Sequence, residues 1–428
     1  MKSLCTLSRS EMQALYHTLL TEYNIAKARG LSLDLSRGKP HPSQLDLSMD
    51  MLAMKPEDII ITRRGTDVRN YGELAGVDEA KEMFAELLGV RMSNIIMGGQ
   101  SSLALMYDAI AKALLLGVYG GSKPWGKQEK LRFLCPTPGY DRHFAICEEF
   151  GIEMISVPMS PTGPDMAMVK EYVENDPAVK GIWCVPKYSN PQGYTYSAET
   201  VDAFAALKPA ADDFRIFWDN AYLVHGHGAA DDELVNIFDA CKKYGSEDMV
   251  YEFFSTSKIT FSGAGLAVFA ASENNVKHLL RQMGIQTIGY DKINQLRHVR
   301  YFGSVQGIYD HMKKHAALLY PKFSEVQAML EEGLGETGIG CWTHPNGGYF
   351  IAYDGLPGTA KRCVALCAEA GLKLTPAGAA FPYGKDPEDK NIRIAPTFAT
   401  PEQLRVSIPL FCLCQKLAAL EVLMKEAA

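Results

Sequence analysis

Short apolar segments alternate with helix-like segments through the middle of the chain. The apolar segments span residues 131–135, 152–158, 181–185, 215–218, 250–254 and 266–270. Apolar runs of this length, separated by stretches with helical periodicity, are typical of strands joined by crossover helices. The pattern therefore predicts an α/β domain built on a largely parallel sheet.

The C-terminal third has a different pattern. A helical stretch over 307–334 is followed by the segment 347–353, a helix near 359–369 and a short strand over 391–396. A chain of 428 residues also exceeds the roughly 250–300 at which one hydrophobic core stops growing. We expect a large domain over 49–305 and a smaller α+β domain over 306–428, which the N-terminal segment 1–48 joins.

Composition and charge exclude several classes of protein. Hydrophobic residues make up 47% and charged residues 22%, as in ordinary globular proteins. The net charge of −7, without a block of basic residues, predicts no nucleic-acid or membrane partner. Neither a signal peptide nor an apolar run of the ~18 residues needed to span a bilayer is apparent, so we expect a cytoplasmic protein. The ten scattered cysteines are interpreted as buried free thiols.

Polar segments follow four of the predicted strands. They are residues 136–140, 188–193, 219–222 and 255–258. In an open parallel sheet, ligands bind in the crevice beyond the carboxyl ends of the strands. These segments are therefore the candidates for a binding or catalytic site.

From about Leu33 to Arg405 the chain resembles the fold-type I aminotransferases, which depend on pyridoxal 5′-phosphate (PLP). More narrowly, it is similar to divergent bacterial aspartate aminotransferases related to the aminotransferase domain of MocR regulators. Three segments support the narrower match: 33–40, 138–143 and 291–297. The resemblance implies a mostly parallel seven-stranded sheet between helices, and a homodimer with active sites at the subunit interface.

The resemblance also implies roles for residues around the PLP ring. Lys258 in Ser-Thr-Ser-Lys would carry PLP as a Schiff base and shuttle a proton. Asp219 would pair with the ring nitrogen, while Tyr222 and Asn190 would bond the ring's phenolic oxygen. Tyr140 would stack on the ring. Alone, a strand-end lysine is usually solvated and Asn-Pro-x-Gly is an ordinary turn; together these residues favour the cofactor site.

The phosphate group of PLP has several candidate partners. Gln100 and Ser101 stand at the start of a helical pattern, where free N–H groups bind anions. Tyr71 resembles the tyrosine that reaches the phosphate of the neighbouring subunit. Common family members carry an arginine eight residues after the lysine, but this position is Leu266 here. Ser255 and Ser257, together with Lys292, are the expected replacements.

Arg393 resembles the arginine that binds the substrate α-carboxylate, and Gly38 and Asn190 would also contact the substrate. We expect a ping-pong transfer from L-aspartate to 2-oxoglutarate. A dicarboxylic substrate needs a second cation. Lys292, acting across the dimer, is the leading candidate, and the others are Arg37, Lys39 and Arg142.

Several alternatives share the same ring-binding residues. Aromatic or branched-chain amino acids, or a PLP lyase such as a β-decarboxylase, would use the same cofactor. A MocR-like effector-sensing module would need a basic DNA-binding extension, for which the N-terminal segment leaves no room. An inactive homologue would be expected to lose Lys258, Asp219 or Arg393, which are all present. The pairs His225/His227 and His311/His315 lack the neighbours of a metal site, and we expect solvated or packing histidines.

Overall fold

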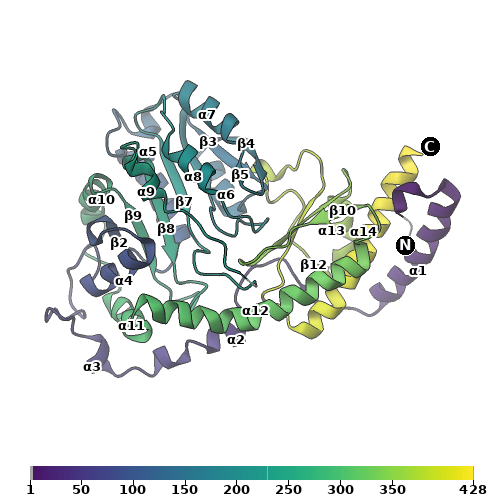
Figure 1. Cartoon of the computed structure of the whole chain (residues 1–428), viewed down its shortest axis with the longest axis horizontal. Helices are drawn as coiled ribbons and strands as arrows, with labels where there is room; N and C mark the ends of the chain where they lie inside the picture. Colours follow the sequence, from purple (N-terminus) through teal and green to yellow (C-terminus); the bar gives the residue numbers. More distant parts are fainter. Residues whose placement is uncertain (1–2, 229, 428) are drawn as a thin grey trace.

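The chain folds into two lobes (Figure 1) in a computed structural model that describes residues 3–228 and 230–427. The strands are β1 (Leu33–Asp34), β2 (Ile95–Met97), β3 (Arg132–Thr137), β4 (Glu153–Ser160), β5 (Gly163–Pro164), β6 (Val179–Cys184), β7 (Arg215–Asp219), β8 (Val250–Ser255), β9 (Ala267–Ala271), β10 (Gly340–Trp342), β11 (Ile351–Gly355), β12 (Leu372–Lys373) and β13 (Asn391–Ile394). The helices are α1 (Arg9–Ala28), α2 (Pro42–Asp46), α3 (Pro56–Ile59), α4 (Asp78–Leu88), α5 (Ser102–Leu116), α6 (Asp141–Glu149), α7 (Met166–Asn175), α8 (Ala198–Ala205), α9 (Ile237–Lys242), α10 (Glu273–Gln286), α11 (Lys292–Phe302), α12 (Val305–Leu334), α13 (Ala360–Glu369) and α14 (Pro401–Glu426).

The large lobe is built on an eight-stranded sheet with the order β2-β9-β8-β7-β6-β3-β4-β5. The five strands from β8 to β4 in this order are parallel, whereas β9, β2 and β5 each run antiparallel to their neighbours. The predicted α/β class is confirmed. The predicted count of seven strands is wrong, because the two-residue β5 adds an eighth strand beside β4.

Side chains of the central strands alternate between two apolar cores. Ile216 and Trp218 of β7 belong to the core on one side of the sheet, and Phe217 belongs to the core on the other. Both faces are buried because helices cover each of them, which explains the continuous apolar runs in the sequence. Asp219 ends β7 as a buried polar residue within this apolar frame.

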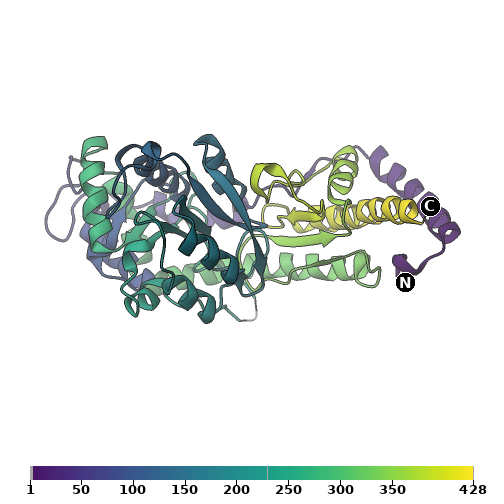
Figure 2. The same cartoon turned by 90° about the horizontal axis from the view of Figure 1, so that it is seen from above.

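The small lobe combines segments from both ends of the chain. Its strands form the sheet β10-β11-β13 and the parallel pair β1-β12. Leu4, Met12 and Leu19 of the N-terminal segment share one core with α13 and α14. The long helix α12 extends along both lobes (Figures 1 and 2), and its residues Ile308 and Leu319 belong to the cores of the large and the small lobe. The exact domain limits remain predictions.

Helix α14 and four of the cysteines, Cys363, Cys367, Cys412 and Cys414, belong to the small-lobe core. Among the described residues, α14 alone is long and apolar enough to cross a membrane by length and composition, but 61% of its most apolar window is buried. It is therefore a core helix. Eight of the ten cysteines are buried free thiols, as predicted. Cys5 and Cys341 are exposed, which corrects the prediction for these two residues.

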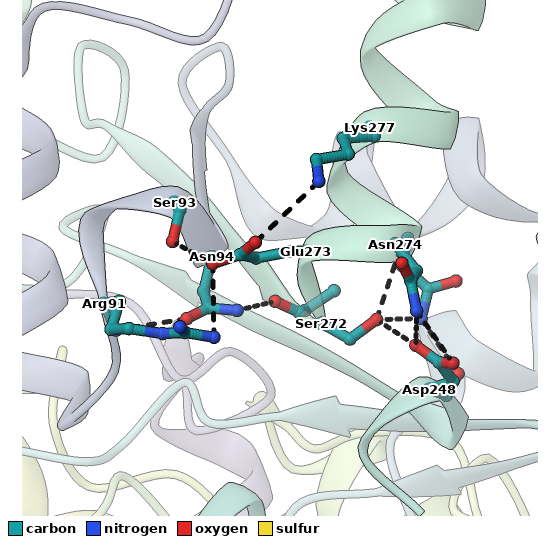
Figure 3. Close-up of polar contacts among 10 residues, drawn as sticks. Arg91, Ser93, Asn94, Asp248, Ser272, Glu273, Asn274 and Lys277 are labelled. Atoms are coloured by element: carbon teal, nitrogen blue, oxygen red, sulfur yellow. Dashed lines mark hydrogen bonds and ion pairs between the residues drawn. The ribbon is translucent and has the colours of Figure 1, made fainter.

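A polar network fixes the antiparallel edge of the large sheet (Figure 3). The Asn94 side chain donates a 2.8 Å hydrogen bond to the carbonyl of Ala271, and Ser93 Oγ donates to Glu273 at 2.7 Å. At the other side of the α10 N-terminus, Ser272 donates to the Asp248 carboxylate. These contacts hold β2, β9 and α10 together, away from the carboxyl ends of the parallel strands.

Candidate active site

A cavity of about 230 Å³ lies at the carboxyl ends of the parallel strands. Nine of the residues singled out from the sequence line it: Gly38, Ser101, Tyr140, Asn190, Asp219, Tyr222, Ser255, Ser257 and Lys258. Two larger hollows, of about 500 and 550 Å³, lie elsewhere and have no tyrosine in their linings. The chemistry of the lining, not the volume, therefore identifies the candidate site.

Lys258 follows β8 and points over an aromatic ring. Its Nζ lies 4.9 Å from the centroid of the Tyr222 ring. Burial lowers the pKa of Lys258, while the nearby Asp219 carboxylate acts in the opposite direction. Burial also raises the pKa of Tyr222 well above its usual value, so this phenol donates hydrogen bonds at neutral pH. A lysine whose pKa is lowered can supply a neutral amine for Schiff-base chemistry.

The carboxylate of Asp219 contacts His143, a residue to which the sequence interpretation assigned no role. Its Oδ2 lies 3.0 Å from His143 Nε2, and the His143 ring stacks on Trp183 with centroids 4.3 Å apart and planes at 9°. The other oxygen, Oδ1, is buried and has no hydrogen-bond partner among the described residues. A buried carboxylate oxygen without a partner is costly in a native protein. A protonated ring nitrogen of a bound cofactor would supply the hydrogen bond that Asp219 Oδ1 lacks.

Arg393 of β13, in the small lobe, contacts two residues that line the cavity, Asn190 and Phe350. Its Nη1 lies 3.2 Å from Asn190 Oδ1 and 2.9 Å from the Asp141 carboxylate. Its Nε and Nη2 donate to Thr375 Oγ1 at 3.4 and 3.3 Å. The guanidinium also lies 4.9 Å from the centroid of the Phe350 ring. Arg393 is thus oriented by neighbours on several elements and can present a planar pair of donors to a carboxylate.

Gly38 lies against Phe350. A Cβ at this glycine would come within 2.2 Å of the Phe350 ring, and both residues line the cavity. The missing side chain therefore makes room for the phenyl ring that supports Arg393. Contact between Gly38 and a substrate remains a prediction.

The candidate phosphate partners gather at the start of α5. Ser101 is the N-cap of α5, and its Oγ accepts from Ala104 N at 3.2 Å. Ser257 Oγ donates to the carbonyl of Gln100 at 2.9 Å. Ser101, Ser255 and Ser257 line the cavity. The Gln100 side chain does not line it, so the structure gives Gln100 only a backbone contact with the site.

Leu266 belongs to the apolar core of the large lobe. Its side chain is 2% exposed, and its N–H donates to Thr256 Oγ1 at 2.8 Å. Lys292, a proposed replacement cation, is buried at the start of α11 but does not line the cavity. Tyr71 is 80% exposed and also lies outside the cavity of its own chain. The single chain therefore brings neither Lys292 nor Tyr71 into the site.

The four histidines of the two paired motifs are buried, not solvated. His311 Nε2 lies 3.2 Å from His315 Nε2, and His227 Nε2 lies 3.1 Å from the carbonyl of Gly348. Burial lowers the pKa of His315 and of His227 to about 4. These histidines are neutral at physiological pH, and the packing interpretation holds for them.

The sequence interpretation missed His143, Asp141 and Phe350. The first two follow Tyr140 within one turn at the start of α6, so their proximity to the stacking candidate was the only available signal. Phe350 stands in an apolar run and gives no polar signal at all.

Known proteins match this chain over nearly its whole length. The family model for aspartate amino-transferase matches residues 7–427. The aspartate aminotransferase of Corynebacterium glutamicum is 44% identical over 413 residues, covering 96% of this chain and 95% of that protein. The crystal structure of an aspartate transaminase from Corynebacterium glutamicum superimposes with a TM-score of 0.96 at 43% identity, covering 98% of this chain and 99% of that one.

More distant structures share the fold alone. The α-aminoadipate aminotransferase of Thermus thermophilus, solved with N-(5′-phosphopyridoxyl)-L-leucine, has a TM-score of 0.70 at 18% identity, covering 93% of this chain and 95% of that one. The fold-type I architecture expected from the sequence is therefore confirmed, while the narrower relation to MocR regulators remains a prediction. The extent and identity of the nearer matches decide the family. This chain belongs to the aspartate aminotransferase family.

Proposed function

We propose that this aminotransferase moves the amino group of L-aspartate to 2-oxoglutarate by a ping-pong mechanism, with PLP bound to Lys258. Membership of the family implies the cofactor. The observation that carries the proposal is Asp219 Oδ1, which is buried and has no hydrogen-bond partner among residues 3–228 and 230–427; Asp219 and Lys258 line the same cavity. A carboxylate in this position can keep a pyridine nitrogen protonated.

When bound, PLP supplies an electron sink for the charge that develops at the substrate Cα. Asp219, backed by His143, stabilises the positive ring nitrogen. Tyr222 and Asn190 hydrogen-bond the ring's phenolic oxygen, and Tyr140 stacks on the ring. Lys258 would hold the cofactor through its Nζ, and as a free amine this Nζ would accept the proton from the substrate Cα.

The phosphate is held by Ser101, Ser255 and Ser257 beside the N-terminus of α5, where backbone N–H groups favour an anion. Gln100 contributes through its backbone. Tyr71 reaches the phosphate of the partner subunit, which makes the active enzyme a homodimer. The high exposure of Tyr71 in the single chain supports this assignment.

Arg393 binds the substrate α-carboxylate, with Asn190 beside it and Gly38 nearby. The distal carboxylate of aspartate needs another cation. We propose Lys292 acting across the dimer, and the exposed Arg37, Lys39 and Arg142 are the other candidates. We also propose a cytoplasmic location, which the burial of α14 within the small-lobe core supports.

The products formed from L-aspartate test the proposal. With 2-oxoglutarate present, the purified enzyme should form oxaloacetate and glutamate in equal amounts. Alanine or pyruvate in place of oxaloacetate would indicate β-decarboxylation or another lyase reaction. Activity with aromatic or branched-chain amino acids, but not with aspartate, would support transamination and show that aspartate is not the amino donor.

A further inference from the structure

Arg393 forms an ion pair with a carboxylate of the protein itself, that of Asp141. The ion pair joins Arg393 Nη1 to Asp141 Oδ1 at 2.9 Å, across the boundary between the lobes. Asp141 is the one carboxylate paired with Arg393 among residues 3–228 and 230–427. The Arg393 side chain is 9% exposed, whereas that of Asp141 is 34% exposed. The Arg393 side chain is therefore enclosed by its neighbours, whereas the Asp141 side chain is partly accessible to solvent.

We propose that Asp141 is a positioning residue that occupies the α-carboxylate site of Arg393 until a substrate displaces it. This inference rests on the proposed function, in which Arg393 binds the substrate α-carboxylate. A carboxylate held by two parallel N–H···O bonds at the end of a guanidinium needs both Nη atoms. Nη1 is taken by Asp141 and Asn190, so a substrate that binds in this manner must replace Asp141 at Nη1.

Charge compensation explains why such a residue is needed. A guanidinium buried without a carboxylate is strongly unfavourable, because desolvation is not repaid by a partner. Asp141 compensates Arg393 in the substrate-free protein, and the substrate compensates it in the complex. The arginine therefore keeps one orientation and a carboxylate partner in both states.

Displacement of Asp141 is feasible because of where it stands. Asp141 is the residue at the start of α6, directly after the N-cap residue Tyr140. The positive end of the helix dipole favours a carboxylate in the first turn. Once released from Arg393, the Asp141 carboxylate stays at this helix end and turns to solvent, so it does not become a buried unpaired charge.

This competition predicts an unusual effect of Asp141→Asn. The substitution keeps the shape but removes the charge, which leaves Arg393 uncompensated only in the substrate-free protein. Carboxylate ligands should therefore bind more tightly, while the ligand-free protein becomes less stable. A residue that merely oriented Arg393 would produce the opposite effect on binding.

Succinate, a dicarboxylate without an amino group, is the probe, and calorimetric titration of the PLP-loaded protein gives its Kd. We expect Asp141→Asn to lower the Kd for succinate roughly two- to fivefold, the range expected for a partly exposed ion pair. Glu149→Gln, which removes a charge from the exposed end of the same helix, should leave the Kd unchanged. The rise in Tm that saturating succinate causes should also be larger in Asp141→Asn than in wild type.

An unchanged or raised Kd in Asp141→Asn would overturn the inference. Asp141→Ser carries the same expectation, and it decides the question if the asparagine variant does not fold. The absorption spectrum of the wild-type protein with L-aspartate separates this failure from that of the proposed function. A wild-type protein that responds to L-aspartate, with no tighter succinate binding in the variants, overturns the role of Asp141 alone. A wild-type protein that neither responds to L-aspartate nor binds succinate overturns both.

Discussion

Asp219 has one satisfied and one unsatisfied carboxylate oxygen, and this asymmetry is the most informative feature of the site at the residue scale. His143 contacts Oδ2, while Oδ1 is buried without a hydrogen-bond partner in the part of the chain that the structure describes. Asp219→Asn would keep the size of the side chain but lose the negative charge opposite the ring nitrogen. We expect kcat/KM for L-aspartate to fall roughly a hundredfold or more. Steady-state kinetics on PLP-saturated protein would test this, and a loss of only a few-fold would contradict the role.

Leu266 is the residue at which the site departs from the common family pattern. Its side chain is part of the apolar core and 2% exposed. Leu266→Arg would therefore bury a cation without a carboxylate, and we expect it to destabilise the fold by about 3–5 kcal/mol. Thermal unfolding of the variant beside Leu266→Met, a volume-conserving control, would measure this. A Tm equal to wild type with stronger PLP retention would instead mean that the arginine reaches the phosphate.

At the scale of elements, β8 carries a buried carboxyl group close to the site. Burial raises the pKa of Glu252 from 4.5 to about 7, although a 2.8 Å hydrogen bond from Asn220 opposes this rise. Between these values the carboxyl is protonated in the folded protein and ionised in the unfolded chain. The resulting stability is fully present below pH 4.5 and is lost as the pH rises through 7.

Glu252→Gln removes this pH dependence. Its stability relative to wild type should increase from pH 5 to pH 8, by up to about 3 kcal/mol. Denaturant unfolding at the two pH values would measure the difference, with the exposed Glu149→Gln as the control. A difference between Glu252→Gln and wild type that stays constant with pH would show that Glu252 titrates normally.

The sequence predicted the strands that carry the site better than it predicted the edges of the sheet. The apolar runs at 215–218 and 250–254 correspond to β7 and β8 within one residue at each end, because both faces of these strands are buried. The short strands β2 and β5 escaped prediction. Segments of three and two residues are too short for a periodic pattern, and only pairing with β9 and β4 makes them strands.

The roles of His143 and Asp141 could not be predicted from the sequence for a related reason. Both lie in the first turn of α6, and their partners Asp219 and Arg393 are 76 and 252 residues away in the chain. No local pattern encodes such contacts. Lys258, Asp219 and Tyr222 were identifiable because they directly follow predicted strands, where a parallel sheet gathers its ligand-binding residues.

At the scale of the whole molecule, we expect a homodimer in solution. Light scattering should give a mass twice that of the 47.1 kDa chain. Tyr71→Phe should leave this mass unchanged and weaken PLP binding roughly ten- to a hundredfold, because it removes one hydrogen bond to an anion. Equilibrium dialysis would measure the PLP affinity. A monomer that retains PLP and full activity would contradict both the dimer and the assignment of Tyr71.

The most direct test of the central claim is the absorption spectrum of the purified, PLP-loaded protein during addition of L-aspartate and then 2-oxoglutarate. We predict that aspartate replaces the band of the lysine-bound cofactor with that of the aminated form, and that 2-oxoglutarate restores the original band. Lys258→Ala should show no such cycle. A wild-type protein that binds no PLP, or whose bound PLP responds to neither compound, would contradict the account.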